Sequence, residues 1–292
     1  MIQEFKKIES VNGEINLPGD KSISHRALIF SALANGTSVI KNLSNAIDVR
    51  STLNCFEQLG IKYQSVANEL KIFGIGYGNL KSPNNSLNAG NSGTTARLLT
   101  GILSVQNFDS QIIGDQSLSK RPMKRVIEPL QLMGGKFSSN DFKLPLKIFA
   151  NSTPRSIVYE LKIPSAQVKS AILLAGVHLD EETCVIENDV IRNHTELMLD
   201  LKIEERENQR LIYSSKKNYP KSAEYFIPSD ISSASFLIVL ALLTKNSTLV
   251  IRNVSLNKTR TGLLEHLIKM GAKIKYEKDR KSTRLNSSHG II

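Results

Sequence analysis

The chain has 292 residues, of which 40% are hydrophobic and 22% charged, with a formal net charge of +11 at pH 7. These proportions are ordinary for a soluble globular protein. No apolar run reaches the roughly 18 residues that a membrane-spanning helix needs, and the N-terminus lacks the apolar core of a signal peptide. We therefore expect a cytoplasmic protein of one or two domains.

A unit of about 70 residues recurs four times along the chain. Each unit begins a helix with a run rich in Ser and Thr, continues into a short β-branched strand, and then shows a second helical pattern. The four helix starts are residues 20–26, 91–97, 164–170 and 229–233, and the strands are residues 39–41, 111–113, 184–186 and 249–251. Helices that alternate with strands predict an α/β or α+β layer fold.

The second helical pattern ends in a glycine at Gly60, Gly134 and Gly271, where a left-handed C-cap fits. The third copy, which ends near Leu201, lacks this glycine. The first helix of a unit is apolar almost all round, and such helices are buried on most faces. The pattern therefore predicts buried helices with sheets on the outside.

The basic charge indicates an anionic partner. The lysines are scattered and only 6% of the residues are aromatic, with no Trp, so the stacking platform of a single-strand nucleic-acid binder is missing. An anionic small molecule is the better interpretation. Cys55 and Cys184 have no metal-site spacing, and we interpret them as buried, reduced thiols. The scattered histidines predict no metal site either.

Residues 20–26 place Lys21 and Arg26 near a helix start, with Ser22 as the expected N-cap and Lys21 just outside the helix. Cations oppose the helix dipole there, so two of them indicate that an anion binds. The alternative is a pair of solvated cations beside a structural cap. The spacing of a Walker A loop is absent.

Two further segments carry similar features. Gly93 permits close approach of a ligand to the backbone, and Thr94 and Thr95 offer hydroxyls at a helix start; an ordinary turn and cap is the alternative. Pro122 fits the first position of a helix and would put Arg121 at its positive end, although a solvated basic cluster is the alternative.

The third unit offers neutral donors and one cation. Ser165 and Gln167 suit a phosphate or a sugar-like hydroxyl, and Arg192 stands near the start of the unit's second helix, as Arg50 does in the first unit. This recurrence favours a shared role facing an anion.

Taken together, these segments resemble the 5-enolpyruvylshikimate-3-phosphate synthase family. The matching segments are residues 17–27, 90–97, 120–123, 164–171 and 192–196. The nearest alternative is the UDP-N-acetylglucosamine 1-carboxyvinyltransferase family, which typically has Lys-Asn in place of Lys21-Ser22 and a reactive loop cysteine that cannot be placed here. A different class of protein remains open, a non-catalytic basic fragment that binds anions or nucleic acid.

The resemblance implies an inside-out α/β prism built from βαβαββ units, with helices buried, sheets outside, and four of the family's six units present. Residues 19–228 would form a complete three-unit N-terminal domain. Residues 1–18 plus 229–280 would form an incomplete second domain. Residues 281–292 lack the repeat pattern, and we interpret them as a non-native tail.

The resemblance also implies a transferase of the shikimate pathway, which leads to chorismate and the aromatic amino acids. The family transfers the enolpyruvyl group of phosphoenolpyruvate to the 5-hydroxyl of shikimate 3-phosphate and releases phosphate, without a cofactor or metal. We expect a monomer that binds these small molecules and neither nucleic acid nor membrane.

The family's binding residues carry over by motif. For shikimate 3-phosphate they are Lys21, Ser22, Arg26, Ser165, Gln167 and Arg192. For phosphoenolpyruvate they are Lys21, Asn91, Gly93, Thr94, Arg121 and Gln167. Ile191 stands where the family usually has Ser. The family's acid/base Asp and Glu would lie beyond the last residue, so the catalytic residues are unknown and we expect this chain to be inactive alone.

Overall fold

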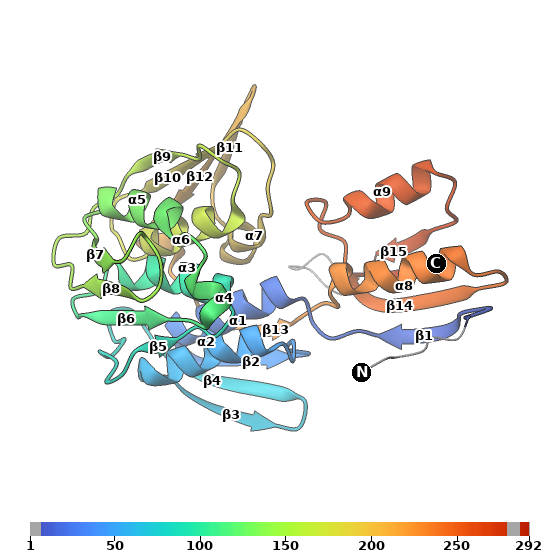
Figure 1. Ribbon diagram of the computed structural model, residues 1–292, viewed down its shortest axis with the longest axis horizontal. Helices are drawn as coiled ribbons and strands as arrows, with labels where there is room; N and C mark the ends of the chain where they lie inside the picture. The colour runs from blue at the N-terminus through green and yellow to red at the C-terminus, as the bar shows by residue number, and fades with distance from the viewer. Residues whose placement is uncertain (1–6, 279–286, 292) are drawn as a thin grey trace. The chain divides into compact units, whose positions relative to one another are not determined.

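The computed structural model describes residues 7–278 and 287–291 (Figure 1). The described residues form a mixed α/β fold with four sheets of four strands each. They divide into two compact units: one is Lys21–Phe226, and the other joins the residues up to Asp20 with those from Ile227 onward. No described helix has both the length and the apolar character to cross a membrane.

The unit Lys21–Phe226 contains three of the sheets, which share one strand pattern. In each sheet the first two strands are parallel and the remaining neighbours are antiparallel. The first sheet has the order β13-β2-β4-β3, with β2 (Asn35–Lys41), β3 (Lys62–Val66), β4 (Glu69–Ile75) and β13 (Glu224–Phe226). The second has the order β5-β6-β8-β7, with β5 (Leu87–Asn88), β6 (Ser110–Ile113), β7 (Lys136–Ser139) and β8 (Leu146–Phe149). The third has the order β9-β10-β12-β11, with β9 (Val158–Glu160), β10 (Thr183–Glu187), β11 (Ile203–Arg206) and β12 (Gln209–Ser214).

The last strand of this unit completes its first sheet. Strand β13 pairs in parallel with β2, so that Glu224 lies opposite Val39 and Phe226 opposite Lys41 (Figure 1). This pairing connects residues more than 180 positions apart in the sequence, since the side-chain hydrogen bond from Lys41 to Glu224 spans 183 residues. The unit is therefore closed by its two ends, and all three of its sheets reach four strands.

The helices of this unit differ in how far they are buried. They are α1 (Lys21–Leu33), α2 (Ile47–Gln58), α3 (Gly93–Leu103), α4 (Gln116–Ser119), α5 (Lys124–Leu132), α6 (Ala166–Gly176) and α7 (His194–Leu199), with a short 3-10 turn at Lys216–Asn218. In α1, 11 of 13 residues are buried, and 9 of 11 are buried in both α3 and α6. At Gly101 an added Cβ would lie 2.2 Å from the backbone oxygen of Ala171, so this glycine lets α3 approach α6 closely.

Two sequence-based helix starts are corrected. Helix α1 begins at Lys21, so Lys21 lies inside the helix and Ser22 is its second residue rather than its N-cap. Helix α5 begins at Lys124 with Met123 at the cap position, so Pro122 precedes the helix instead of opening it. The short helix α4 ends at Ser119, and residues 120–123 form the turn between α4 and α5.

The other unit contains one sheet, β1-β14-β16-β15. Its elements are β1 (Asn12–Asn16), α8 (Ile231–Leu243), β14 (Thr248–Ser255), α9 (Gly262–Lys269), β15 (Lys275–Lys278) and β16 (Ser287–Ile291). Strand β1 pairs in parallel with β14. Of the segment interpreted as a tail, residues 281–286 and 292 lie outside the described residues, whereas Ser287–Ile291 form β16. Its non-native origin and the domain boundaries stay predictions.

Candidate functional site

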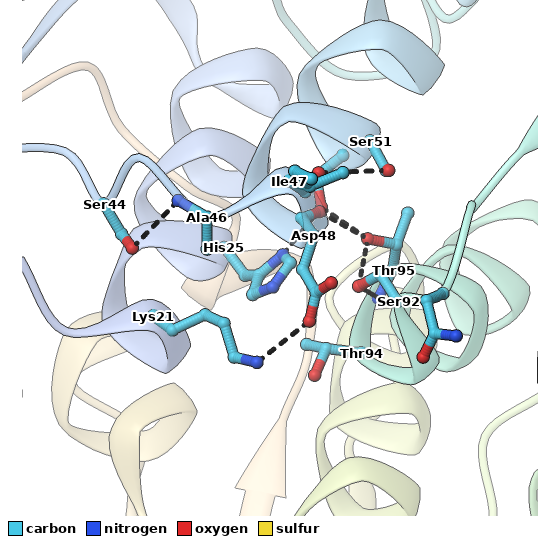
Figure 2. Close-up of polar contacts among 12 residues, drawn as sticks. Lys21, His25, Ser44, Ala46, Ile47, Asp48, Ser51, Ser92, Thr94 and Thr95 are labelled. Atoms are coloured by element: carbon cyan, nitrogen blue, oxygen red, sulfur yellow. Dashed lines mark hydrogen bonds and ion pairs between the residues drawn. The ribbon is translucent and has the colours of Figure 1, made fainter. Parts of the chain in front are cut away.

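The helix starts of the unit Lys21–Phe226 hold the residues that the sequence singles out. Lys21 opens α1, and its Nζ lies 2.9 Å from Oδ2 of Asp48 in the first turn of α2 (Figure 2). Both side chains are partly exposed. The sequence analysis missed Asp48, because nothing in the sequence brings the two helix starts together. The carboxylate holds the ammonium group at the helix start, where Lys21 would meet an incoming anion.

A chain of hydroxyls links α1, α2 and α3. His25 Nδ1 lies 2.7 Å from Thr52 Oγ1, which lies 2.7 Å from Thr95 Oγ1, which in turn donates to Ser92 Oγ at 2.7 Å. Ser92 caps α3 by accepting from the Thr95 backbone N–H (Figure 2). Burial, assisted by the charge of Arg26, lowers the pKa of His25 to about 3. The imidazole is therefore neutral at neutral pH, and the network fixes the N-terminus of α3.

Gln167 is held in one orientation by two residues of the neighbouring helix. Its Nε2 donates to Thr94 Oγ1 at 3.0 Å, and its Oε1 accepts from Arg97 at 3.1 Å. Arg97 also donates to the backbone carbonyls of Gly93 at 3.2 Å and Pro122 at 3.3 Å. Arg97 thus connects three of the segments that the sequence analysis treated separately.

Gly93 lies close to the guanidinium groups of two arginines. A Cβ at this position would lie 2.5 Å from Arg97 Nη1 and 3.6 Å from Arg121 Nη1. Burial lowers the pKa of Arg97, and the charges of Arg121 and Arg125 lower it further. Burial is the main cause of this shift, and the smaller contributions of Arg121 and Arg125 reflect that both positive charges lie near Arg97.

Arg121 is oriented by a polar relay. It donates to Asn91 Oδ1 at 2.9 Å, and Asn91 donates to Asp115 Oδ2 at 2.6 Å. Asp115 caps α4, and the hydrogen bond from the Leu118 backbone N–H lowers the pKa of its carboxyl group, with Asn91 adding to the effect. Asp115 therefore stays ionised and holds Asn91 in place. Asn91 in turn orients the exposed side chain of Arg121.

Arg26 differs from the other cations because it is buried, with 4% of its surface exposed. Its Nε donates to Thr195 Oγ1 and its Nη2 to Ser170 Oγ, both at 2.7 Å, and Nη1 donates to the Ser22 carbonyl at 3.0 Å. No pattern in the sequence indicates Thr195 or Ser170 as partners of Arg26. Its guanidinium group is thus oriented by three separate helices.

Hydrogen bonds connect several of the expected residues in groups, one of which is Arg26 with the carbonyl of Ser22. Gly93, Thr94 and Gln167 are connected through Arg97, and Asn91 is bonded to Arg121. Ser165 caps α6 by accepting from the Val168 backbone N–H. Arg192 is exposed, two residues before α7 begins. Arg97 belongs to the helix start at residues 91–97 but is not among the predicted site residues, although its position four residues after Gly93 puts it on the same helix face.

Among residues 7–278 and 287–291, no cluster of three His, Cys, Asp or Glu side chains could hold a metal ion. The described residues have a mixed α/β fold, and the unit Lys21–Phe226 carries capped helix starts with cations beside them. A family model for EPSP synthase (3-phosphoshikimate 1-carboxyvinyltransferase) matches residues 5–290, and the chain belongs to this family. The resemblance seen in the sequence is thereby confirmed, and the UDP-N-acetylglucosamine alternative is not favoured.

Individual relatives agree with the family assignment. The chain is 49% identical over 278 residues to a 3-phosphoshikimate 1-carboxyvinyltransferase of Petrotoga mobilis, covering 93% of this chain and 64% of that protein. It is 48% identical over 266 residues to the protein of that name from Leuconostoc citreum, covering 90% and 62%. A solved EPSP synthase from Acinetobacter baumannii superposes with a TM-score of 0.89 at 38% identity, covering 97% of this chain and 65% of that one. The chain therefore spans less than two thirds of the length of these relatives.

Proposed function

We propose that this chain serves the reaction named for its family, the transfer of the enolpyruvyl group of phosphoenolpyruvate to the 5-hydroxyl of shikimate 3-phosphate. The observation that carries the proposal is the approach of the Arg97 and Arg121 guanidinium groups to Gly93 at the N-terminus of α3. Both substrates are multiply charged anions. Fixed cations and helix N-termini would offset their mutual repulsion and stabilise charge that develops during transfer.

Within this proposal the residues divide between the substrates. Arg26, Ser22, Ser165, Gln167 and Arg192 serve shikimate 3-phosphate, and Asn91, Gly93, Thr94 and Arg121 serve phosphoenolpyruvate. Lys21 and Gln167 contact both. Lys21 acts as a point charge and exchanges part of its interaction with Asp48 for the phosphates, whereas Arg121 offers a bidentate fork.

The finer architecture belongs to the same proposal. Residues 19–228 act as one domain of three βαβαββ units arranged as an inside-out prism, and residues 1–18 with 229–280 contribute a further unit to a second domain. The strand pattern shared by the three sheets of the unit Lys21–Phe226 supports the proposal for the first domain. We also propose a cytoplasmic monomer that binds no nucleic acid.

Binding to this chain tests the proposal directly. Shikimate 3-phosphate is titrated into the protein by calorimetry, and phosphoenolpyruvate is then titrated at saturating shikimate 3-phosphate. Arg121→Gln should weaken the second titration by at least about tenfold, the loss of one charged hydrogen-bonding group, and leave the first unchanged. Arg155→Gln removes an equal charge from an exposed loop residue and is the matched control.

The same titrations discriminate the alternatives. UDP-N-acetylglucosamine binding in place of shikimate 3-phosphate would favour the related transferase family. Binding of an oligonucleotide with neither small molecule bound would favour a basic binding fragment. Equal effects of the Arg121 and Arg155 substitutions would refute the assigned site.

A further inference from the structure

A buried network of charges lies beside Arg26. Lys169 on α6 is completely buried, and its Nζ lies 2.5 Å from Glu187 Oε2 on β10 and 2.5 Å from Glu196 Oε1 on α7. Arg210 on β12 donates to the other oxygen of Glu187 at 2.8 Å. Arg210 also lies 3.5 Å from the exposed Glu205, and Lys169 is the cation that touches both buried carboxylates.

Such a network is a costly way to hold a core together. Each buried ion loses its hydration, and apolar residues of similar volume are often as stabilising or more so. Burial raises the pKa of Glu187 despite the neighbouring Lys169, which reflects this desolvation. The best-attested benefit of a buried ion pair is that it fixes one register between the elements it joins.

The elements that the ion pair between Lys169 and Glu196 joins are the helices α6 and α7. Helix α7 has only six residues, and its N-cap residue Asn193 makes no side-chain capping bond, so it depends on tertiary contacts for its position. Glu196 supplies a buried charged anchor, and its neighbour Thr195 contacts Ser170, the neighbour of Lys169, at 2.8 Å. Two consecutive residues of α6 thus meet two consecutive residues of α7.

Arg26 binds the two hydroxyl groups that meet in this contact. Its Nε donates to Thr195 on α7 and its Nη2 to Ser170 on α6, each at 2.7 Å. A shift of α7 by one turn, or its detachment, would remove the Nε partner and with it the bond that ties the guanidinium group to α7, while the bonds to Ser170 and to the Ser22 carbonyl would remain. The orientation of Arg26 therefore depends on an ion pair that Arg26 does not itself touch.

We infer that Lys169 is a positioning residue for Arg26: its ion pair with Glu196 holds α7 in the register that fixes the guanidinium group. The consequence for shikimate 3-phosphate affinity rests on the proposed function, in which Arg26 holds that substrate. The orientation of Arg26 itself does not rest on it.

The test uses the full chain with two readouts. The first is the exchange-protected Nε–H signal of Arg26 in a ¹H–¹⁵N spectrum, assigned by its loss in Arg26→Lys. The second is the dissociation constant for shikimate 3-phosphate from calorimetry. Lys169→Met should remove the Arg26 signal, weaken binding at least about tenfold, and lower the melting temperature by roughly 10 °C, because Glu196 is left buried without its partner.

A double variant separates positioning from stability. Lys169→Met with Glu196→Gln carries no unpaired charge and keeps the Glu187–Arg210 pair, so it should recover more than half of the lost melting temperature. The Arg26 signal should stay absent and binding weak. Recovery of both readouts in the double variant would overturn the inference, as would a normal Arg26 signal in Lys169→Met. If Lys169→Met does not fold, the double variant alone decides.

Glu187→Gln is the matched control, because it removes the other carboxylate on Lys169 but leaves the tie to α7. It should lower the melting temperature but keep the Arg26 signal and the affinity for shikimate 3-phosphate. Loss of the Arg26 signal in this variant would overturn the inference, because the whole network rather than the tie to α7 would then orient Arg26. If the unaltered chain binds no shikimate 3-phosphate, the proposed function fails, and the Arg26 signal still decides the role of Lys169.

Discussion

Helices α6 and α8 open the third and fourth copies of the sequence repeat, yet they are buried to very different extents. In α6, 9 of 11 residues are buried, and one of them is the charged Lys169. Helix α8 is apolar without interruption from Phe236 to Leu243, but only four of its 13 residues are buried. Phe236 is 79% exposed and Leu243 is 80% exposed.

The difference follows from what packs around each helix. Helix α6 contacts the helices α3 and α5 and the strands β10 and β12. The four buried residues of α8 pack in one cluster with β14 and Leu264 of α9. Apolar character makes burial favourable, but the number of neighbouring elements decides how much of a helix is buried.

The largest expected effect comes from truncating matched leucines on the two helices. Leu173→Ala on α6 removes a side chain with no exposed surface and should lower the free energy of unfolding by about 4 kcal/mol, the transfer loss plus the cavity. Leu243→Ala on α8 should change it by less than about 0.5 kcal/mol. Urea denaturation measures both. Similar losses at the two positions would show that α8 is buried in solution.

A second contrast adds a methyl group to a glycine of each unit. Gly101→Ala should cost about 2 to 3 kcal/mol, because the new Cβ would meet a backbone oxygen of α6 at 2.2 Å and the helices must separate. Gly262→Ala at the start of α9 meets nothing within 4 Å and should be neutral or slightly stabilising. Thermal melts of both variants check this, and a tolerated alanine at position 101 would contradict the close packing of α3 on α6.

The stability of the protein should fall in acid because of the buried His25. Its pKa is about 3 in the folded protein and 6.5 when unperturbed, so the unfolded state takes up the proton first as the pH falls below 6.5. Stability should therefore drop by about 2 kcal/mol between pH 7 and pH 5 on account of this residue. His25→Gln should flatten that dependence, whereas His266→Gln on the exposed face of α9 serves as the control. An unchanged pH dependence in His25→Gln would argue against a neutral, buried imidazole.

The smallest effect on stability is expected at the candidate site. In Gly93→Ala the new Cβ would lie 2.5 Å from Arg97 Nη1, so this nitrogen must move away. The nitrogen is at the end of a flexible side chain and can do so. The free energy of unfolding should change by less than about 1 kcal/mol. Affinity for phosphoenolpyruvate, measured at saturating shikimate 3-phosphate, should fall because Arg97 no longer holds Gln167. Unchanged affinity for phosphoenolpyruvate together with an unchanged melting temperature would show that Arg97 does not contribute to the site.

The sequence by itself determined the local features of this protein. Repeated helix starts, β-branched strands and C-terminal glycines gave the elements of the mixed α/β fold, since these signals depend on neighbouring residues alone. The motif residues Gly93, Thr94 and Gln167 were identified in the same way, and so was the family. The exact starts of α1 and α5 were missed, because a helix end is set by the cap geometry that the surrounding turn allows.

Only the tertiary structure decided which distant groups meet. It pairs β13 with β2, places Asp48 beside Lys21, and joins Gln167 to Arg97. It also buries Lys169 between two carboxylates and leaves the more apolar α8 exposed. These outcomes depend on contacts between residues tens to hundreds of positions apart, and composition and periodicity carry no information about which surfaces the folded chain brings into contact.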